Sequence, residues 1–338
     1  MPYQTEETAA VVTESMSQIS ERGCILCGGV TREVLSGVED NRFGVPGTYA
    51  VHECAACGLE QIDPRPRRDD LKKLYESYYN FGGQRGTVYG RLREKFFASW
   101  LYRVWLVLDG DGSFHSRKGS GTLLDIGCNE GRGLQIYERN GFLPEGLELN
   151  AKAAGVAREA GFRVYETDLE DFRPTVPYDV VVLSNVLEHS LDPKRMLHDV
   201  AGILKPGGQV WISCPNNQSW LRTVFGHAWI NWHVPFHIVH FSTSTLRSLL
   251  ESTGFAGIEI RQVTPALWVA SSIIARLFAR RGRATRQLRN PLLVAALLIL
   301  GRTVLSPLLY IGNRSGRGDC LLATAQLPCN NPFQKRVA

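Results

Sequence analysis

The chain has 338 residues, 44% of them hydrophobic and 21% charged, and is long enough to bury a large core. Seven of its eight cysteines lie in two CxxC pairs or in predicted buried strands, which excludes a disulfide-stabilised secreted domain. The net charge is +5. The segment from Arg261 to Gly318 contains ten arginines and no acidic residue, so the remainder of the chain carries a net charge of about −5.

The N-terminal segment is polar. Residues 1–22 contain several acids and lack the apolar core of a signal peptide. We expect a loosely ordered tail on a cytoplasmic protein.

Residues 23–66 form a small predicted module. Cys24 and Cys27 are separated from Cys54 and Cys57 by 26 residues, and each CxxC pair is followed by glycine. Two such pairs supply four thiolates at the spacing of a structural zinc site, and a metal would stabilise a segment too short for a good core. Four reduced cysteines without a metal are the alternative, and a redox CxxC fits two pairs in one module less well.

A helical connector is expected over residues 67–120. Apolar residues recur with helical spacing in Asp69–Tyr79, and Tyr89–Leu108 predicts a second, aromatic-rich helix. Residues 110–121 are polar and glycine-rich, as a linker is.

A strand, a glycine turn and a helix start are predicted in Leu123–Gly133, LLDIGCNEGRG. Such a turn lets backbone amides approach a ligand, and the helix N-terminus favours an anionic group. A second strand ends 23 residues after Asp125 in an acid, Glu148, which can take both hydroxyls of a ribose.

These pieces resemble the class I S-adenosylmethionine-dependent methyltransferases. The matching motifs come in order as LLDIGCNEGRG, GLELN, ETDLED, YDVVVLSNVLEH and ILKPGGQVWISCPN. Asn129 stands where the family usually has glycine, and asparagine tolerates left-handed backbone better than other residues with a side chain. The N-terminal region CGLEQIDPRPRRDDLKKLYESYY is similar to that of bacterial methyltransferases of polysaccharide, lipid-linked glycan and natural-product pathways.

The expected fold is α/β, a doubly wound, Rossmann-like sheet over residues 121–330. Alternating patterns predict strands at 122–126, 144–149, 163–165, 178–184, 209–214, 255–261 and 320–326. Helices are predicted near 133–140, 151–160, 193–204 and 243–253. The resemblance implies seven strands with the last one antiparallel.

The resemblance also implies which residues bind S-adenosylmethionine. Asp125 and the turn (Gly127, Cys128, Asn129 and Gly131) are expected to hold the amino-acid end of the donor, and Glu148, with Leu149 beside it, the ribose. Asp168 and Leu169 are assigned to the adenine, and Ser184 and Asn185 to the region near the methyl group. For Asp168 an ordinary loop acid is the alternative.

Histidines are the candidate bases. His189, in NVLEH, follows the fourth strand and titrates in the right range to take a proton from a hydroxyl acceptor. His233 and His237, in a stretch that also contains His227 and His240, are the backup bases in a predicted acceptor pocket. For each histidine, packing in the loop is the alternative. Ubiquinone-type relatives use an ExxEH metal motif here, but this chain has Asn185 at its first position, so we expect no catalytic metal.

A helical insert is predicted at residues 264–313. Its longest apolar run, Pro291–Leu300, is about half of a spanning helix. Apolar helices flanked only by arginine suit an anionic membrane surface, here the inner face of the cell membrane. A lid over the site or a dimer face is the alternative.

Transfer of a methyl group to a sugar, a lipid-linked glycan or a related metabolite is the leading interpretation. An RNA methyltransferase is a rival, but four acids lie between the CxxC pairs of the zinc module and the arginine segment is interrupted by long aliphatic runs. A non-catalytic binding protein that kept the fold is the third possibility. The sequence does not fix the acceptor or the oligomeric state.

Overall fold

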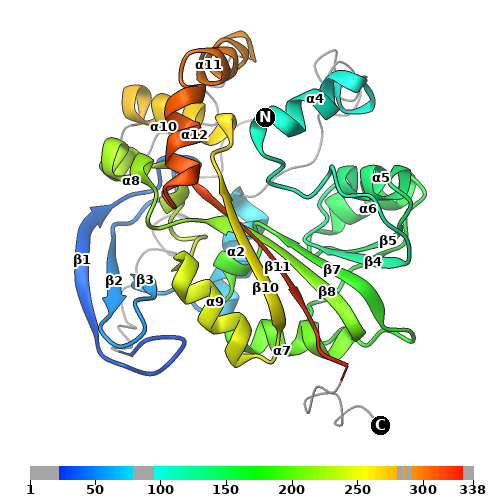
Figure 1. The fold of residues 1–338 in the computed structure, drawn as a ribbon. Helices are drawn as coiled ribbons and strands as arrows, with labels where there is room; N and C mark the ends of the chain where they lie inside the picture. Colours follow the sequence, from blue (N-terminus) through cyan, green and yellow to red (C-terminus); the bar gives the residue numbers. More distant parts are fainter. Residues whose placement is uncertain (1–22, 79–94, 280–284, 286–290, 330–338) are drawn as a thin grey trace.

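The computed structural model describes residues 23–78, 95–279, 285 and 291–329. These residues form a seven-stranded sheet in the order β10-β11-β8-β7-β4-β5-β6 and a four-stranded sheet in the order β1-β2-β3-β9, which lies beside it (Figure 1). The strands of the larger sheet are β4 (Thr122–Ile126), β5 (Leu143–Leu147), β6 (Val164–Tyr165), β7 (Tyr178–Ser184), β8 (Leu204–Pro215), β10 (Ala256–Val263) and β11 (Cys320–Gln326). Those of the smaller sheet are β1 (Thr31–Val38), β2 (Tyr49–Cys54), β3 (Glu60–Asp63) and β9 (Val239–His240).

Helices flank the sheets. The α-helices are α2 (Arg68–Tyr78), α4 (Trp100–Asp109), α5 (Arg132–Arg139), α6 (Ala151–Glu159), α7 (Pro193–Ile203), α8 (Trp220–Phe225), α9 (Thr243–Ser252), α10 (Ala266–Phe278), α11 (Pro291–Thr303) and α12 (Ser306–Arg314). Short 3-10 helices are η1 (Leu187–His189), η2 (Gly226–Ala228) and η3 (Ile230–Trp232).

The larger sheet is parallel from β6 to β8 and antiparallel at β11 and β10. Its inner strands β11, β8, β7 and β4 are largely buried on both faces, whereas the edge strand β10 is mostly exposed or half-buried. In β7, Val180 and Val182 join one hydrophobic cluster while Val181 and Leu183 join the other. The prediction of a mostly parallel, doubly wound sheet with an antiparallel last strand is confirmed.

Two local features differ from the sequence analysis. The helix expected over 89–108 is interrupted at Ser99, whose backbone is extended, and α4 begins one residue later. The four-stranded sheet was not predicted, and its edge strand β9 comes from residues far along the chain that pair with β3. The expected tail, residues 1–22, lies outside the described residues.

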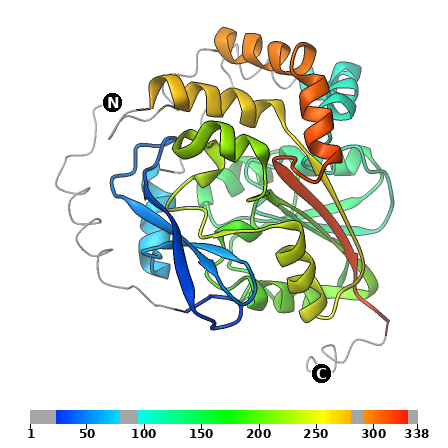
Figure 2. The ribbon, with the colours of Figure 1, turned by 60° about the vertical axis from the view of Figure 1, so that its left-hand side comes forward.

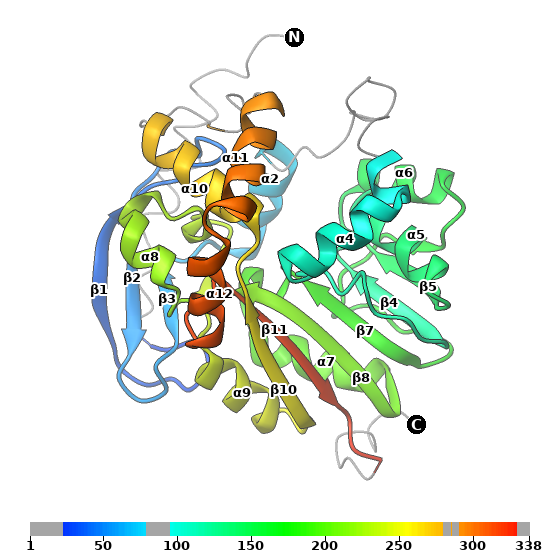
Figure 3. The ribbon, with the colours of Figure 1, turned by 45° about the horizontal axis from the view of Figure 1, so that its top comes forward.

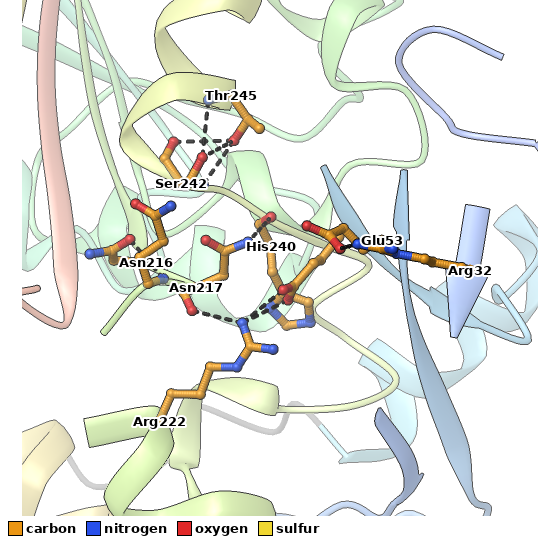
Figure 4. A network of polar contacts seen from close by, with 10 residues as sticks. Arg32, Glu53, Asn216, Asn217, Arg222, His240, Ser242 and Thr245 are labelled. Atoms are coloured by element: carbon orange, nitrogen blue, oxygen red, sulfur yellow. Dashed lines mark hydrogen bonds and ion pairs between the residues drawn. The ribbon is translucent and has the colours of Figure 1, made fainter. Parts of the chain in front are cut away.

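An ion pair joins the two sheets. Glu60 of β3 is buried, and the guanidinium of Arg222 in α8 donates to both of its carboxylate oxygens at 2.8 and 2.9 Å. The same nitrogen also donates to the backbone carbonyl of Asn217 at 2.7 Å (Figure 4). Trp229 and Trp232 pack with β1–β3 in one shared cluster. The cysteine-bearing sheet is therefore an integral part of the fold.

The insert helices follow directly from the sheet. Because β10 is antiparallel to β11, and β11 is antiparallel to β8, β10 runs in the same direction as β4, β7 and β8. Its carboxyl end, where α10 begins, therefore lies at the same edge as the carboxyl ends of those strands. Figures 1 and 2 show α10, α11 and α12 together at this end of the molecule.

Candidate functional site

The four cysteines of the CxxC pairs lie together. Their sulfur atoms all fall within 4.8 Å of one another, with 3.5 Å between Cys24 and Cys57 and 3.5 Å between Cys27 and Cys54. Each pair forms a tight turn closed by an amide of Gly28 or Gly58 at positive φ. Four thiolates around one zinc ion sit about 3.8 Å apart, so the cluster has the size of a tetrahedral zinc site.

The glycine turn after β4 is where the sequence places it. Asn129 has a φ of 53°, which confirms that it adopts the left-handed backbone expected of a residue in a glycine position. Gly131, also at positive φ, begins α5, and a Cβ there would lie 2.7 Å from the Ala157 side chain. The amides of Gly127 and Cys128 donate to the carbonyl of Leu147, so they hold the turn against β5.

Two carboxylates meet at the carboxyl ends of β4 and β5. Glu148 accepts hydrogen bonds from the amides of Asn129 and Asn150 at 2.9 and 2.8 Å, one at each oxygen. Each oxygen keeps a second lone pair for a ligand hydroxyl. Asp125 is buried, and burial together with the charge of Glu148 raises its pKa to about 7. Burial also raises the pKa of Glu148. Desolvated acids of this kind favour a ligand with positive charge.

The other residues predicted to bind S-adenosylmethionine lie at the same edge of the sheet, at the carboxyl ends of the parallel strands. Asp168 is half-buried, Leu169 is buried, and Leu149 is 66% exposed. Ser184 ends β7 and its hydroxyl lies 3.1 Å from that of Ser213. Asn185 follows with a φ of 56° and an exposed side chain. All of them lie at strand ends or in the loops that follow, where open parallel sheets bind ligands.

Aromatic and histidine rings pack together around the loops that follow β7 and β8, and we call this buried cluster the chamber. The His237 ring centroid lies 4.7 Å from that of His189 and 4.7 Å from that of His233. Phe43, from the loop between β1 and β2, lies 5.2 Å from His233, and Tyr75 of α2 lies 6.2 Å from His189. The structure thus brings all three predicted bases together. The rings of the chamber come from four separated parts of the sequence.

His189 is fully engaged within this chamber. Its Nδ1 lies 2.8 Å from the Tyr75 hydroxyl, and its ring also hydrogen-bonds the backbone carbonyl of Phe236. Burial and the nearby Arg42 guanidinium lower its pKa to about 3. In this arrangement the ring holds the chamber walls in place.

His237 has one ring nitrogen directed at a carboxyl group. Its Nδ1 donates to the carbonyl of Asn231 at 2.8 Å, which leaves Nε2 as an acceptor 3.9 Å from Glu188 Oε1. Both Glu188 oxygens are buried and have no hydrogen-bond partner in the described part of the chain. Burial raises the pKa of Glu188 to about 8 and lowers that of His237. A buried acid and a neutral imidazole this close together, here Glu188 and His237, can accept and share a proton.

Glu188, His189 and His237 offer ligand atoms within 4.8 Å of one another. Because His189 already hydrogen-bonds Tyr75 and Phe236, its ring is not available to a metal in this arrangement. That the chain works without a catalytic metal stays a prediction.

The other two histidines of the cluster lie outside the chamber. His227 Nε2 bonds the backbone carbonyl of Ser36 in β1, and His240 is buried in β9 against Trp232. Tyr75 and Phe43 belong to the chamber but were not among the predicted site residues. No local motif marks Phe43 or Tyr75, because they reach the chamber only through tertiary packing.

A separate hollow of about 520 Å³ lies at the other end of the larger sheet. It is lined by Arg117, Lys118 and Lys205 near the start of β7 and β8. None of the predicted donor or base residues lines it.

An open sheet with acids at the carboxyl ends of adjacent parallel strands is the arrangement typical of nucleotide-binding α/β proteins. A family model described as a methyltransferase domain matches residues 89–260, half of the chain, and the chain belongs to this family.

Curated relatives include ubiquinone biosynthesis O-methyltransferases. That of Klebsiella pneumoniae is 32% identical over 143 residues, which cover 39% of this chain and 57% of the relative. That of Erwinia tasmaniensis is 32% identical over 141 residues, covering 39% and 56%. The chain thus spans little more than half the length of these relatives.

Solved methyltransferase structures are more distant. Phosphoethanolamine N-methyltransferase 2 of Haemonchus contortus, in complex with S-adenosyl-L-methionine, is 18% identical with a TM-score of 0.44, covering 76% of this chain and 60% of that chain. An S-adenosylmethionine-dependent methyltransferase of Archaeoglobus fulgidus is 21% identical with a TM-score of 0.40, covering 71% and 100%.

Proposed function

We propose that this protein transfers a methyl group from S-adenosylmethionine to a hydroxyl of a small acceptor, most directly a sugar, a lipid-linked glycan or a related metabolite. The observation that carries the proposal is the pair of desolvated acids, Asp125 and Glu148, next to a histidine chamber at one sheet edge. The ubiquinone biosynthesis relatives, named as O-methyltransferases, support oxygen as the methylated atom.

The donor fits the residues at the ends of β4 and β5. It carries an ammonium and a sulfonium, and these positive charges offset the cost of ionising buried Asp125. The free lone pairs of Glu148 would accept the two ribose hydroxyls. Asp168 and Leu169 would contact the adenine, while Ser184 and Asn185 lie nearest to the chamber. The bound donor supplies an electrophilic methyl group, and the chain contributes positioning and proton removal.

His237 is the base that the geometry favours among the three candidates. Its Nε2 is an acceptor, whereas His189 is engaged by Tyr75 and Phe236. As the acceptor oxygen attacks, its proton would pass to Nε2, and ionised Glu188 would stabilise the resulting imidazolium. Phe43 and Phe236 pack edge to face with their centroids 5.5 Å apart and make the wall beside His233 apolar.

The cysteine cluster would hold a structural zinc ion. All four positions are filled by protein, which leaves none for catalysis. The loop that follows β1 carries Phe43 and is folded around the Asp40 carboxylate, which accepts from the amides of Arg42, Phe43 and Val45. The cysteines lie at the other end of the β1–β2 hairpin from this loop, where Thr31 pairs with Cys54. Cys24 and Cys54 share a hydrophobic cluster with Leu71 of α2, the helix that carries Tyr75, so zinc would steady that wall of the chamber.

Methyl transfer from isotopically labelled donor to a panel of nucleotide sugars, glycolipids and hydroxylated aromatic compounds tests the proposal. With an acceptor in hand, His237→Ala should lower kcat at least about 100-fold, the usual contribution of a general base, and leave donor affinity unchanged. His227→Ala is the control, since that ring lies outside the chamber. Full activity of the His237 variant would contradict the assignment.

A further inference from the structure

Exposed apolar side chains gather on α4 and the insert helices. Of the 22 large hydrophobic residues exposed in the described part of the chain, five lie on α4 and ten between Leu267 and Ile311. Val107 of α4 is 80% exposed and Ile311 of α12 is 61% exposed. We call these fifteen residues the apolar face: Trp100, Leu101, Val104, Val107, Leu108, Leu267, Leu277, Phe278, Leu293, Ile299, Leu300, Val304, Leu308, Tyr310 and Ile311. Concentrations of this kind mark interaction surfaces.

The helices of the apolar face are fastened to one another. Asp109, the last residue of α4, accepts hydrogen bonds from the amide of Ala266 in α10 and from Arg302 in α11, both at 2.8 Å. Figures 1 and 3 show α4 at the same end of the molecule as the insert helices. The face is thus held in place by a partly buried ion pair that joins parts of the sequence almost 200 residues apart.

Its charge is of one sign. Arg103, Arg276, Arg314 and Arg317 are exposed on or beside these helices. The sequence has no acid between Arg261 and Gly318, and Asp109 of α4 is neutralised by Arg302. Trp100 and Tyr310 add the amphipathic rings that suit a water–lipid boundary. On the described residues of these helices the exposed charged side chains are all arginines, so the surface is complementary to anionic headgroups.

The helices are too short to cross a bilayer singly. In the described residues no single helix passes a length and hydropathy test for a span, although Ala296–Thr303 and Ser306–Arg314, bent by 64°, pass it as a pair. The 13 residues of α11 extend about 20 Å, against about 30 Å of hydrocarbon. Such helices can lie along the boundary with one face in the lipid.

We propose that the apolar face docks on an anionic phospholipid membrane. This surface goes beyond the proposed methyl transfer and does not depend on it. Because α10 begins at the edge where Asp125, Glu148 and the histidine chamber lie, docking would set that edge toward the headgroups. Together with the proposed function, on which this point rests, docking implies that the acceptor is carried on a lipid.

Vesicle co-sedimentation of the full chain tests the proposal. We expect binding to phosphatidylcholine vesicles containing phosphatidylglycerol, weakened by salt, and at least tenfold weaker binding to pure phosphatidylcholine. Val107→Glu and Ile311→Glu should each lower binding at least tenfold. Leu143→Glu is the matched control, because Leu143 is 68% exposed at the start of β5, the opposite edge, and should bind like wild type.

Two results would overturn the proposal. One is wild-type protein that fails to bind, or binds both vesicle types equally. The other is a wild-type dimer, measured by light scattering, that the two variants dissociate without altering vesicle binding, since this would make the face a contact between copies. Donor binding by calorimetry should be equal in all variants, so failure here leaves the proposed function untouched.

Discussion

Replacing Asp125 by asparagine should stabilise the ligand-free protein while removing its donor affinity. The Asp125 pKa is about 7 in the folded protein, because of burial and Glu148, against an ordinary 3.8. A carboxyl whose pKa rises on folding favours the folded state below pH 3.8, and this advantage is lost as the pH rises to 7. Above pH 7 the ionised group costs about 4 kcal/mol, at 1.36 kcal/mol per pKa unit.

Urea denaturation of both proteins at pH 5.5 and pH 8.5 measures this effect. The unfolding free energy of Asp125→Asn should exceed that of wild type, and the gap should widen by about 2 kcal/mol between these pH values. S-adenosylmethionine should stabilise only the wild type. A gap that is absent or independent of pH would refute the reasoning.

Asp179→Asn is the control with the opposite sign. The Lys205 ammonium and the amide and hydroxyl of Thr122 bond to the Asp179 carboxylate and hold its pKa below the usual value. This variant should therefore lose stability by an amount that is constant above pH 3.8, and so equal at pH 5.5 and pH 8.5, and that shrinks as the pH falls below 3.8; it should bind the donor as wild type does.

Three more outcomes are expected. Wild-type activity should rise with pH through an ionisation near 8, because Glu188 then loses its proton and can stabilise protonated His237. Glu188→Gln should abolish this rise in the pH–activity profile. A variant that keeps the rise would refute the role of Glu188. Cys27→Ser should abolish zinc content measured by mass spectrometry and weaken acceptor binding far more than donor binding; an unchanged metal content would count against the site. Arg222→Met leaves Glu60 buried without its partner and should cost about 3–5 kcal/mol in urea denaturation, whereas exposed Arg32→Met should cost under about 1 kcal/mol; equal losses would contradict this.

The sheet was predictable because its strands are apolar on both faces. The strands at 122–126, 178–184 and 320–326 have the predicted ends. Asn129 could be placed in left-handed backbone because the motif requires that conformation and asparagine tolerates it. Local sequence was sufficient where a residue's conformation depends on its neighbours in the chain.

The chamber was only partly predictable. His189 and His237 are 48 residues apart, and their contact depends on how the loop after α8 folds back over β7. The carboxylate that faces His237 is Glu188, which lies next to the first candidate base and far in the sequence from the histidine stretch. Strand β9 has only two residues, too few for any periodic pattern. These features depend on packing between distant segments.

Donor binding tests the central claim most directly. Calorimetry with S-adenosylmethionine and its demethylated product should show micromolar binding to wild type and none to Glu148→Gln. Glu145→Gln, on the same strand but bonded to Tyr165 and Tyr178, should bind normally. Absence of binding by folded, zinc-replete wild-type protein would contradict the account, and the sheet would then have a function other than methyl transfer.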